Sequence, residues 1–325
     1  MVNQLILTVT RACNLRCSYC PTAKDGWPSL SESDARRAVS MFSDDFGGGS
    51  IKMFGGEPLL VPDVVKAALD EAKDRENIRW VYLSTNGLGL DSSWLEFLSS
   101  YPKAILTISM DGRPEDHRGQ RRAVNDGVPD SYEHLMTLLP QLLQTPRVVI
   151  TQTIAPATAV RAAENFAHLL SLGFWRFNFL PGYYIPWRST QLDNLDVAFN
   201  DIAELIEQRW EQLDRTYIRN LFTLAPTPFF NTGLVVDSDR TIHPSNVGLS
   251  GALDHTRDQT IIGTLDDPPS METLQAGAAR VSGLIETALP AKVWESTQAV
   301  DQKLSAFCRS LYPHWARYKR RRDAA

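Results

Sequence analysis

The chain has 325 residues, of which 43% are hydrophobic, and its formal net charge is −5 at pH 7. This length suits one large α/β domain, or a core domain with a smaller companion. No apolar stretch is long enough to cross a bilayer, the first residues lack a signal-peptide pattern, and the negative charge argues against a nucleic-acid footprint. We therefore expect a cytoplasmic protein with neither membrane nor nucleic acid as a partner.

The first half of the chain alternates short apolar runs with segments of helical periodicity. Six runs predict strands, at residues 4–10, 50–55, 78–85, 103–110, 147–154 and 174–180. Helical spacing occupies residues 31–43, 61–74, 91–99, 131–144 and 159–171, and Ser31 with Asp34 forms a variant of the capping box. Repeated strand–helix units imply parallel strands joined by right-handed crossovers, and six units are too few for an eightfold barrel. The expected fold is therefore a partial (β/α)6 TIM-like barrel, with ligands at the carboxyl ends of its strands.

The pattern changes after residues 180–187, and we place a boundary there, with a barrel over 1–182 and a smaller α+β accessory region over 183–325. This region should contain a helix at 193–213, a hairpin at 234–244, a strand within 260–267 and two closing helices. We interpret His243 as a surface turn residue. The basic run at 317–322 favours a solvated helix end, and a docking tail for an acidic partner is the alternative.

Three of the four cysteines, Cys13, Cys17 and Cys20, lie within eight residues, and Cys308 is distant. This is a poor disulfide framework, but soft thiolates in a tight group favour iron–sulfur or zinc. Zinc would need a fourth ligand, and the nearest histidine is His117. Three thiolates can instead hold three irons of a cubane and leave the fourth open. Three ordinary buried thiols are the remaining reading.

The motifs "CNLRCSYC", "FGGEP" (54–58), "STNG" (84–87) and "SMDG" (109–112) follow the first four predicted strands. Together they resemble the radical S-adenosylmethionine (SAM) superfamily, in its branch of peptide-maturing and anaerobic sulfatase-maturing enzymes. The resemblance covers about residues 3–181. It implies that a reduced cluster passes one electron to SAM bound at the open iron, which yields a 5′-deoxyadenosyl radical that abstracts hydrogen from a substrate.

The resemblance also implies roles for individual residues. Cys13, Cys17 and Cys20 would ligate one [4Fe–4S] cluster, and Arg121, four residues past His117, would pair with the SAM carboxylate in preference to Arg122. The two glycines of "GGEP" would let backbone carbonyls approach the ligand. The expected SAM-binding residues are Tyr19, Gly55, Gly56, Glu57, Pro58, Ser84, Thr85, Asn86, Ser109, Asp111 and Arg121.

The accessory region resembles a degenerate SPASM or twitch domain, with Ser245 where the family has a cysteine. We therefore expect no auxiliary cluster and a single [4Fe–4S] cluster in the chain. Cys308 is either a buried structural thiol or a catalytic hydrogen-atom donor to the substrate radical. The aromatic segment 177–187 either lines the open barrel mouth or packs on the accessory helix.

The leading hypothesis is a radical SAM enzyme that modifies a ribosomally made peptide by cross-linking, epimerisation or another C–H functionalisation. The alternative is the same chemistry on a small molecule such as an amino acid, sugar or nucleoside, and a non-catalytic iron–sulfur protein is the third. The expected partners are the substrate and an electron donor such as flavodoxin or ferredoxin. A separate leader-peptide recognition protein is a further expected partner, because no extension precedes the first strand.

Overall fold

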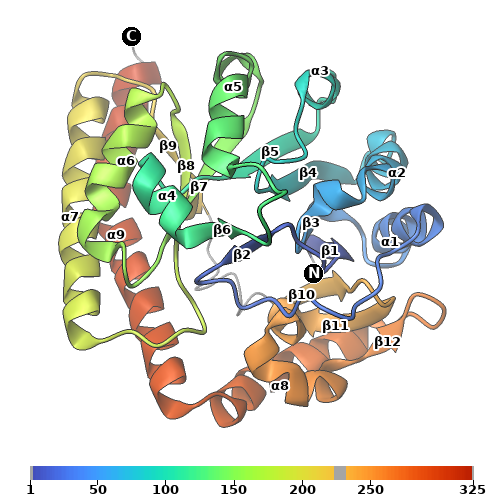
Figure 1. Cartoon of the computed structure of the whole chain (residues 1–325). Helices are drawn as coiled ribbons and strands as arrows, with labels where there is room; N and C mark the ends of the chain where they lie inside the picture. Colours follow the sequence, from blue (N-terminus) through green and yellow to red (C-terminus); the bar gives the residue numbers. More distant parts are fainter. Residues whose placement is uncertain (1–2, 223–231, 324–325) are drawn as a thin grey trace.

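The computed structural model describes residues 3–222 and 232–323, and within them a ten-stranded sheet is surrounded by helices on its outer face (Figure 1). Six strands are the predicted ones, and each is parallel to its neighbours among the six. They are β1 (Gln4–Thr10), β3 (Gly49–Gly55), β4 (Ile78–Thr85), β5 (Ala104–Ser109), β7 (Val148–Ile154) and β8 (Arg176–Pro181). The prediction of a partial α/β barrel is therefore confirmed.

Seven α-helices of the described residues lie between or directly after these strands, and most of them bury an apolar face. They are α1 (Glu32–Asp45), α2 (Pro62–Lys73), α3 (Ser92–Ser100), α4 (Pro114–Gln120), α5 (Ser131–Gln144), α6 (Ala162–Ser171) and α7 (Ser189–Glu211). The capping box predicted at the start of α1 is present, because the Ser31 hydroxyl accepts from the amide of Asp34 and the Asp34 carboxylate accepts from the amide of Ser31. Such a cap contributes about 1 kcal/mol to a helix.

A hairpin from the second half of the chain extends the sheet beyond β1. Strand β10 (Thr232–Val236) pairs in parallel with β1 and antiparallel with β11 (Thr241–Ser245), so the predicted hairpin is confirmed. The strand expected within 260–267 is only two residues long, β12 (Gly263–Thr264), and it follows a 3₁₀ helix, η5 (Gly251–Thr260). The sheet thus continues across the boundary expected after residue 182, and the two-part division remains a prediction.

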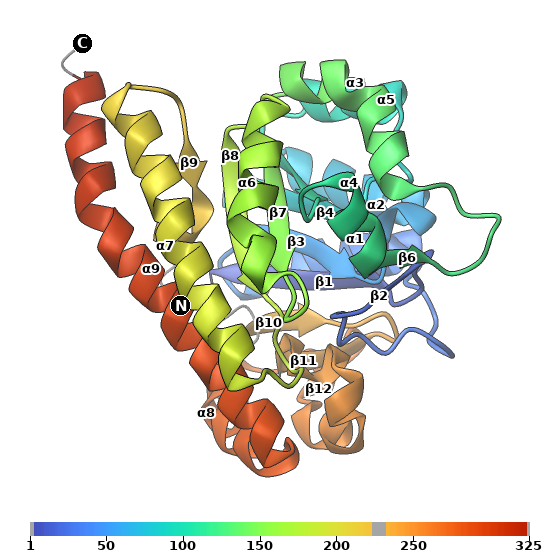
Figure 2. The ribbon, with the colours of Figure 1, turned by 60° about the vertical axis from the view of Figure 1, so that its left-hand side comes forward.

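At the opposite edge, β9 (Tyr217–Ile218) pairs with β8 and leads into the 3₁₀ helix η3 (Arg219–Phe222). Outside this edge, α7 packs along α9 (Ala291–Asp323), and Phe199 of α7 stacks on Phe307 of α9 with 4.8 Å between ring centroids. Figure 2 shows these two long helices side by side, and α8 (Met271–Ala288) beneath the hairpin. The basic run lies in the last turns of α9. No helix of the described residues is long and apolar enough to span a bilayer.

Candidate active site at the strand ends

One cavity opens at the carboxyl ends of the parallel strands and extends into the barrel. Three cysteines and nine of the eleven expected SAM-binding residues line it. The lining residues of these two sets are Cys13, Cys17, Cys20, Tyr19, Gly55, Gly56, Glu57, Ser84, Thr85, Asn86, Ser109 and Arg121. Pro58 and Asp111 do not line the cavity. The structure thus brings residues from four separate motifs into one space.

The cysteine loop follows β1 and is held over the barrel by a small second sheet. Its strand β2 (Leu15–Cys17) pairs antiparallel with β6 (Arg121–Ala123), which places Cys17 directly opposite Arg121. The amide of Ser18 also donates to the carbonyl of Gln120 at 3.0 Å. Backbone pairing therefore fixes the middle cysteine against the arginine, although 104 residues separate the two in sequence.

The three thiols differ in their electrostatic surroundings. Burial raises the pKa of Cys13, and it raises that of Cys17 to about 12 against the opposing charge of Arg121. Burial also acts to raise the pKa of Cys20, but the Lys24 ammonium, whose Nζ lies 3.1 Å from Cys20 Sγ, contributes to lowering it overall. Without a metal, two of these thiols would be neutral, and a bound cation would favour their thiolate forms.

The donor set fits an iron–sulfur cluster. The three free thiols line one cavity, and the charges of Cys13 and Cys20 both add to the raised pKa of Cys17. Within the described ranges, no three Cys, His, Asp or Glu side chains surround a single point as ligands of one metal ion would. A cluster needs no such point, because each thiolate binds a different iron.

Arg121 is held by a buried carboxylate. Its Nε and Nη2 each donate to Asp111 at 3.0 Å, while the Tyr19 hydroxyl donates to the same carboxylate at 2.7 Å. Its Nη1 faces Cys17 Sγ at 4.0 Å. The fork of Arg121 is thus largely used by Asp111, and a ligand in the cavity can meet Nη1. Asp111, expected among the SAM contacts, positions Arg121 and Tyr19 from behind the cavity wall.

The backbone amide of Asp111 is in turn supported from behind. It donates to Nδ1 of the buried His117 at 3.3 Å, and the Nε2 of this histidine lies 2.8 Å from the Ser131 hydroxyl. Burial lowers the pKa of His117 to about 4. The imidazole is therefore neutral at pH 7, and its Nδ1 is available as an acceptor.

Gly55 and Gly56 are required by a close backbone approach. Gly55 has φ 131°, and an added Cβ would lie 2.2 Å from the Thr10 carbonyl oxygen. At Gly56 the Cβ would meet the carbonyl oxygens of Ala12 at 2.0 Å and Arg11 at 2.3 Å. The expected reason for these glycines was approach to a ligand. The structure adds a second reason, since β3 must pass against the segment that leads into the cysteine loop.

Glu57 connects two strand ends inside the fold. Its buried carboxylate accepts from the Asn86 amide and the Thr85 hydroxyl, both at 2.7 Å, and from the Leu59 amide at 3.0 Å. Burial raises its pKa even though these donors favour the charged form. The Asn86 side chain then donates to Asn14 in the cysteine loop at 2.7 Å. Glu57 and Asn86 therefore join β3, β4 and the cysteine loop.

Cys308 lies on α9, partly buried against the core, and it does not line the cavity. Burial raises its pKa to about 12. Burial raises the pKa of Tyr183, which lines the cavity, and the charges of Asp301 and Cys308 add to this shift. The role of Cys308 as a hydrogen donor stays a prediction.

The aromatic segment 177–187 does both things that the sequence left open. Its residues 180–183 line the cavity, whereas the amides of Tyr184 and Trp187 donate to Thr297 and Ser296 of α9 at 3.1 and 2.9 Å. The segment therefore forms a wall between the cavity and the long C-terminal helix.

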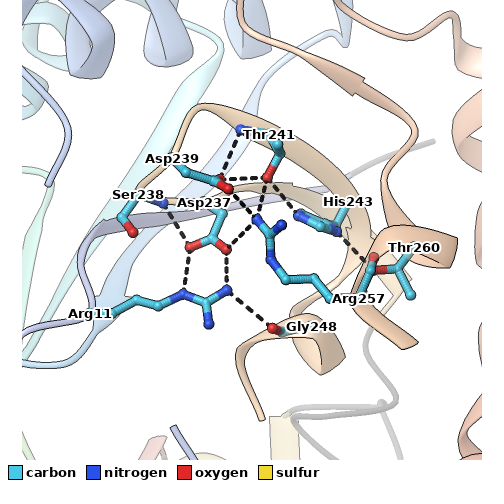
Figure 3. A network of polar contacts seen from close by, with 9 residues as sticks. All are labelled: Arg11, Asp237, Ser238, Asp239, Thr241, His243, Gly248, Arg257 and Thr260. Atoms are coloured by element: carbon cyan, nitrogen blue, oxygen red, sulfur yellow. Dashed lines mark hydrogen bonds and ion pairs between the residues drawn. The ribbon is translucent and has the colours of Figure 1, made fainter. Parts of the chain in front are cut away.

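A buried polar network joins the end of β1 to the hairpin (Figure 3). The fully buried Arg11 donates from Nε to Asp237 at 3.2 Å and forms a second, Nη2 contact with the same carboxylate. Arg257 also donates to Asp237, at 3.2 Å. The guanidinium carbons of Arg11 and Arg257 lie 3.7 and 4.7 Å from the Trp27 ring centroid. Because Arg11 directly precedes the cysteine loop, the network fixes this loop to the second half of the chain.

His243 belongs to this network, so its interpretation as a surface turn residue was wrong. It is 2% exposed, and its ring nitrogens lie 2.9 Å from the hydroxyls of Thr241 and Thr260. Pairing of β10 with β1 buries the hairpin, which local sequence could not reveal. Ser245, the position expected to have lost a cysteine, caps η4 (Asn246–Leu249) by accepting from the Val247 amide.

Sequence reasoning missed several polar residues of the cavity. Lys24 contacts a cysteine thiol, and Asn14 fixes the loop to β4. Lys52 also lines the cavity, and a lysine in the otherwise apolar run "SIKMFG" could have indicated a special role. Arg219 lines it as well, but nothing in its surrounding sequence distinguishes it from a surface arginine.

Residues 7–145 match the sequence model of the Radical SAM superfamily. Among curated proteins, a GTP 3',8-cyclase of Geobacter sulfurreducens is 34% identical over 143 residues, which cover 39% of this chain and 41% of that protein. A cysteine-type anaerobic sulfatase-maturating enzyme of Clostridium perfringens is 30% identical over 135 residues, covering 36% and 35% of the two chains. The matches thus span less than half of either relative.

Solved structures resemble a larger part of the chain. Histidine-tagged anSMEcpe with bound AdoMet superposes with a TM-score of 0.70 at 17% identity, covering 96% of this chain and 97% of that one. Streptococcus suis SuiB bound to its precursor peptide SuiA has a TM-score of 0.58 at 13% identity, covering 77% and 60%. At these identities the likeness shows a shared fold, which includes the second half of the chain for the first structure.

Proposed function

We propose that this chain, whose residues 7–145 are a radical SAM domain, is an enzyme that cleaves SAM reductively and modifies a peptide by abstraction of a hydrogen atom. The observation that carries the proposal is the single cavity that joins three cysteines, the Gly55–Gly56 strand end, Asn86 and Arg121. A cluster with SAM at its open iron would supply the electron transfer and the 5′-deoxyadenosyl radical.

The residues of the chain would hold and orient these groups. Cys13, Cys17 and Cys20 would ligate the cluster, and Lys24 would lower the proton affinity of Cys20. Glu57 would keep the ends of β3 and β4 at a fixed spacing through its three donors. The backbone at Gly55 and Gly56 gives the ligand a wall without side chains.

A peptide substrate is supported by two comparisons. The Clostridium perfringens relative is named as a sulfatase-maturating enzyme, and the SuiB structure is bound to a precursor peptide. For the reaction on a peptide, we propose C–H functionalisation and name no particular bond. An electron donor such as flavodoxin or ferredoxin would be needed for each cleavage of SAM.

A small-molecule substrate is the second candidate, favoured by the 34% identity to a GTP 3',8-cyclase. The two candidates share the cofactor chemistry and differ in what enters the cavity. Turnover with synthetic peptides, compared with turnover on a nucleoside triphosphate, would distinguish them.

Anaerobic reconstitution of the full chain tests the proposal. With a strong reductant and SAM, we expect 5′-deoxyadenosine by liquid chromatography and mass spectrometry, and iron near four per chain. The Cys17→Ala variant should lose both signals, whereas Cys308→Ala, altered outside the cavity, should keep the iron. Absence of 5′-deoxyadenosine from a fully loaded chain would overturn the proposal, and iron near eight would contradict a single cluster.

A further inference from the structure

Two basic side chains face the cavity from inside the barrel. Lys52 lies on β3, three residues before Gly55, and both it and Phe54, two residues further on the same face of the strand, line the cavity. Arg219 begins η3, just beyond β9 at the other edge of the parallel strands. Neither belongs to the motifs that the sequence assigned to SAM.

Neither cation has a polar partner among the described residues. Across residues 3–222 and 232–323, neither Lys52 nor Arg219 forms a hydrogen bond or an ion pair, and both instead lie over rings. Lys52 Nζ is 4.8 Å from the Phe54 ring centroid, and the guanidinium carbon of Arg219 is 4.2 Å from that of Tyr82. The segments outside the described ranges contain no Asp or Glu, so their side chains offer no carboxylate either.

The two charges also act on each other. Burial lowers the pKa of Lys52 to about 8, and the positive charge of Arg219 contributes to this shift in the same direction. Two like charges in one cavity without a counterion are unfavourable, because desolvation and repulsion add. A bound anion would remove both penalties.

Arg219 is held firmly in place. The adjacent Asn220 side chain accepts from the Phe179 amide at 2.8 Å and donates to the Phe179 carbonyl at 2.9 Å. Both atoms of this amide group thus fix η3 to β8. An arginine carried by such an anchor is pre-organised for a ligand, since little backbone freedom remains to be lost on binding.

A third group supports the site independently. Thr107 on β5 is 5% exposed and lines the same cavity, and its hydroxyl has no hydrogen-bond partner in the part of the chain that the structure describes. A buried hydroxyl without a partner carries a desolvation cost that a ligand oxygen would offset. Two cations and one free hydroxyl therefore line the cavity from β3, β5 and η3.

We propose that the cavity recognises its substrate through an oxyanion, a carboxylate or a phosphate, held between Lys52 and Arg219 with the Thr107 hydroxyl as a further donor. Arginine binds such groups through its planar fork, and lysine acts as a point charge. This inference rests on the proposed function, which makes the cavity a substrate site. In a peptide the anion would be an acidic side chain or the terminal carboxylate, and in a small molecule a phosphate ester.

Protection of Lys52 from acylation tests the site without any need for turnover. The reconstituted full chain is treated with an amine-acylating reagent, with and without inorganic phosphate or acetate, and modification at Lys52 is followed by peptide mass spectrometry. At a probe concentration about ten times its Kd, the rate at Lys52 should fall about tenfold, because only the free site reacts. Lys66, which lies over the Trp94 ring and outside the cavity, should react at an unchanged rate in the same sample.

Matched variants locate the effect. Arg219→Gln should abolish the protection, and Arg219→Lys should restore part of it, which a folding defect would not do. Arg176→Gln is the control, because Arg176 stacks on Trp175 and does not line the cavity. Stronger protection by phosphate supports a phosphate ester, and stronger protection by acetate supports a carboxylate.

Three results would overturn the inference. These are an unchanged rate at Lys52 with both probes, equal protection in Arg219→Gln, and full protection by SAM alone, which would assign the cations to the SAM carboxylate. The assay is independent of SAM cleavage. Missing protection with intact 5′-deoxyadenosine formation contradicts only the anion site, whereas protection without SAM cleavage contradicts only the proposed function.

Discussion

The two parts of the cavity differ in whether their charged side chains have polar partners. Beside the cysteine loop, Arg121 is paired with Asp111, and Glu57 accepts three hydrogen bonds. Inside the barrel, Lys52 and Arg219 have no hydrogen bond or ion pair among the described residues, and each lies over an aromatic ring. Paired groups position the chain itself, whereas groups without a partner are suited to a ligand. The comparison predicts that removal of a charge destabilises the chain beside the cysteine loop and stabilises it inside the barrel.

The largest expected effect follows from breaking the pair beside the cysteine loop. Asp111→Asn would leave the buried Arg121 without its counterion and should lower the free energy of unfolding by about 3–5 kcal/mol. Urea unfolding under anaerobic conditions measures this. Asp70→Asn, which alters an exposed pair with Arg36, should change stability by less than about 1 kcal/mol. Similar losses in the two variants would contradict the role given to Asp111.

The second largest effect is a loss of stability in acid, caused by the two buried histidines. Burial lowers the pKa of His117 and of His243 to about 4, from an ordinary value of 6.5. The unfolded chain therefore takes up protons first, so the stability is complete above about pH 6.5 and is lost as the pH falls to about 4, by about 3 kcal/mol for each histidine.

Urea midpoints of the full chain between pH 7 and 4 measure this acid effect. His243→Asn should reduce the slope, and the exposed His255→Asn should not. An identical slope in wild type and His243→Asn would show that the buried imidazole does not contribute.

A side chain at Gly56 should have a smaller effect on stability and should also lower the iron content. Gly56→Ala would place a Cβ against two backbone carbonyls, so the cysteine loop must shift, at a cost of about 2 kcal/mol. We expect iron per chain to fall well below that of wild type after reconstitution. Gly119→Ala is the control, because nothing lies within 4 Å of the added atom and Gly119 is in α4. Wild-type iron in Gly56→Ala would mean that the loop tolerates the displacement.

The smallest effect has the opposite sign. Lys52→Met removes a partly buried cation that has no partner among the described residues and keeps most of the volume, so it should stabilise the chain by about 1 kcal/mol in phosphate-free buffer. Lys66→Met, on the exposed face of α2, should stay within about 0.5 kcal/mol of wild type. Thermal unfolding compares them. A destabilised Lys52→Met would indicate an unseen favourable role for the charge in the empty cavity.

Local sequence predicted the strand–helix alternation well. Buried strands are short apolar runs, and in a helix the apolar residues recur every three to four positions. The Ser31 capping box and the hairpin turn were found in the same way. Pairing of β10 with β1 was not predicted, since it depends on contacts across more than two hundred residues. For that reason His243 was expected at the surface.

In the site, too, local motifs were predictable and contacts between distant residues were not. Cysteines and glycines at successive strand ends are visible as motifs, and the cavity gathers most of them. Asp111 pairs with Arg121 and does not line the cavity, and its expected contact with SAM stays a prediction. Lys52 and Arg219 line the same cavity because the open sheet is folded, which no local sequence pattern predicts.

The contact between Arg11 and Asp237 also has a consequence for how the chain is made. The two residues are 226 positions apart, so at 5–20 residues per second a ribosome completes Asp237 about 11–45 s after Arg11. Throughout this interval the residue that leads into the cysteine loop lacks its carboxylate partner. Metal loading that needs a fixed cysteine loop would therefore follow the synthesis of Asp237.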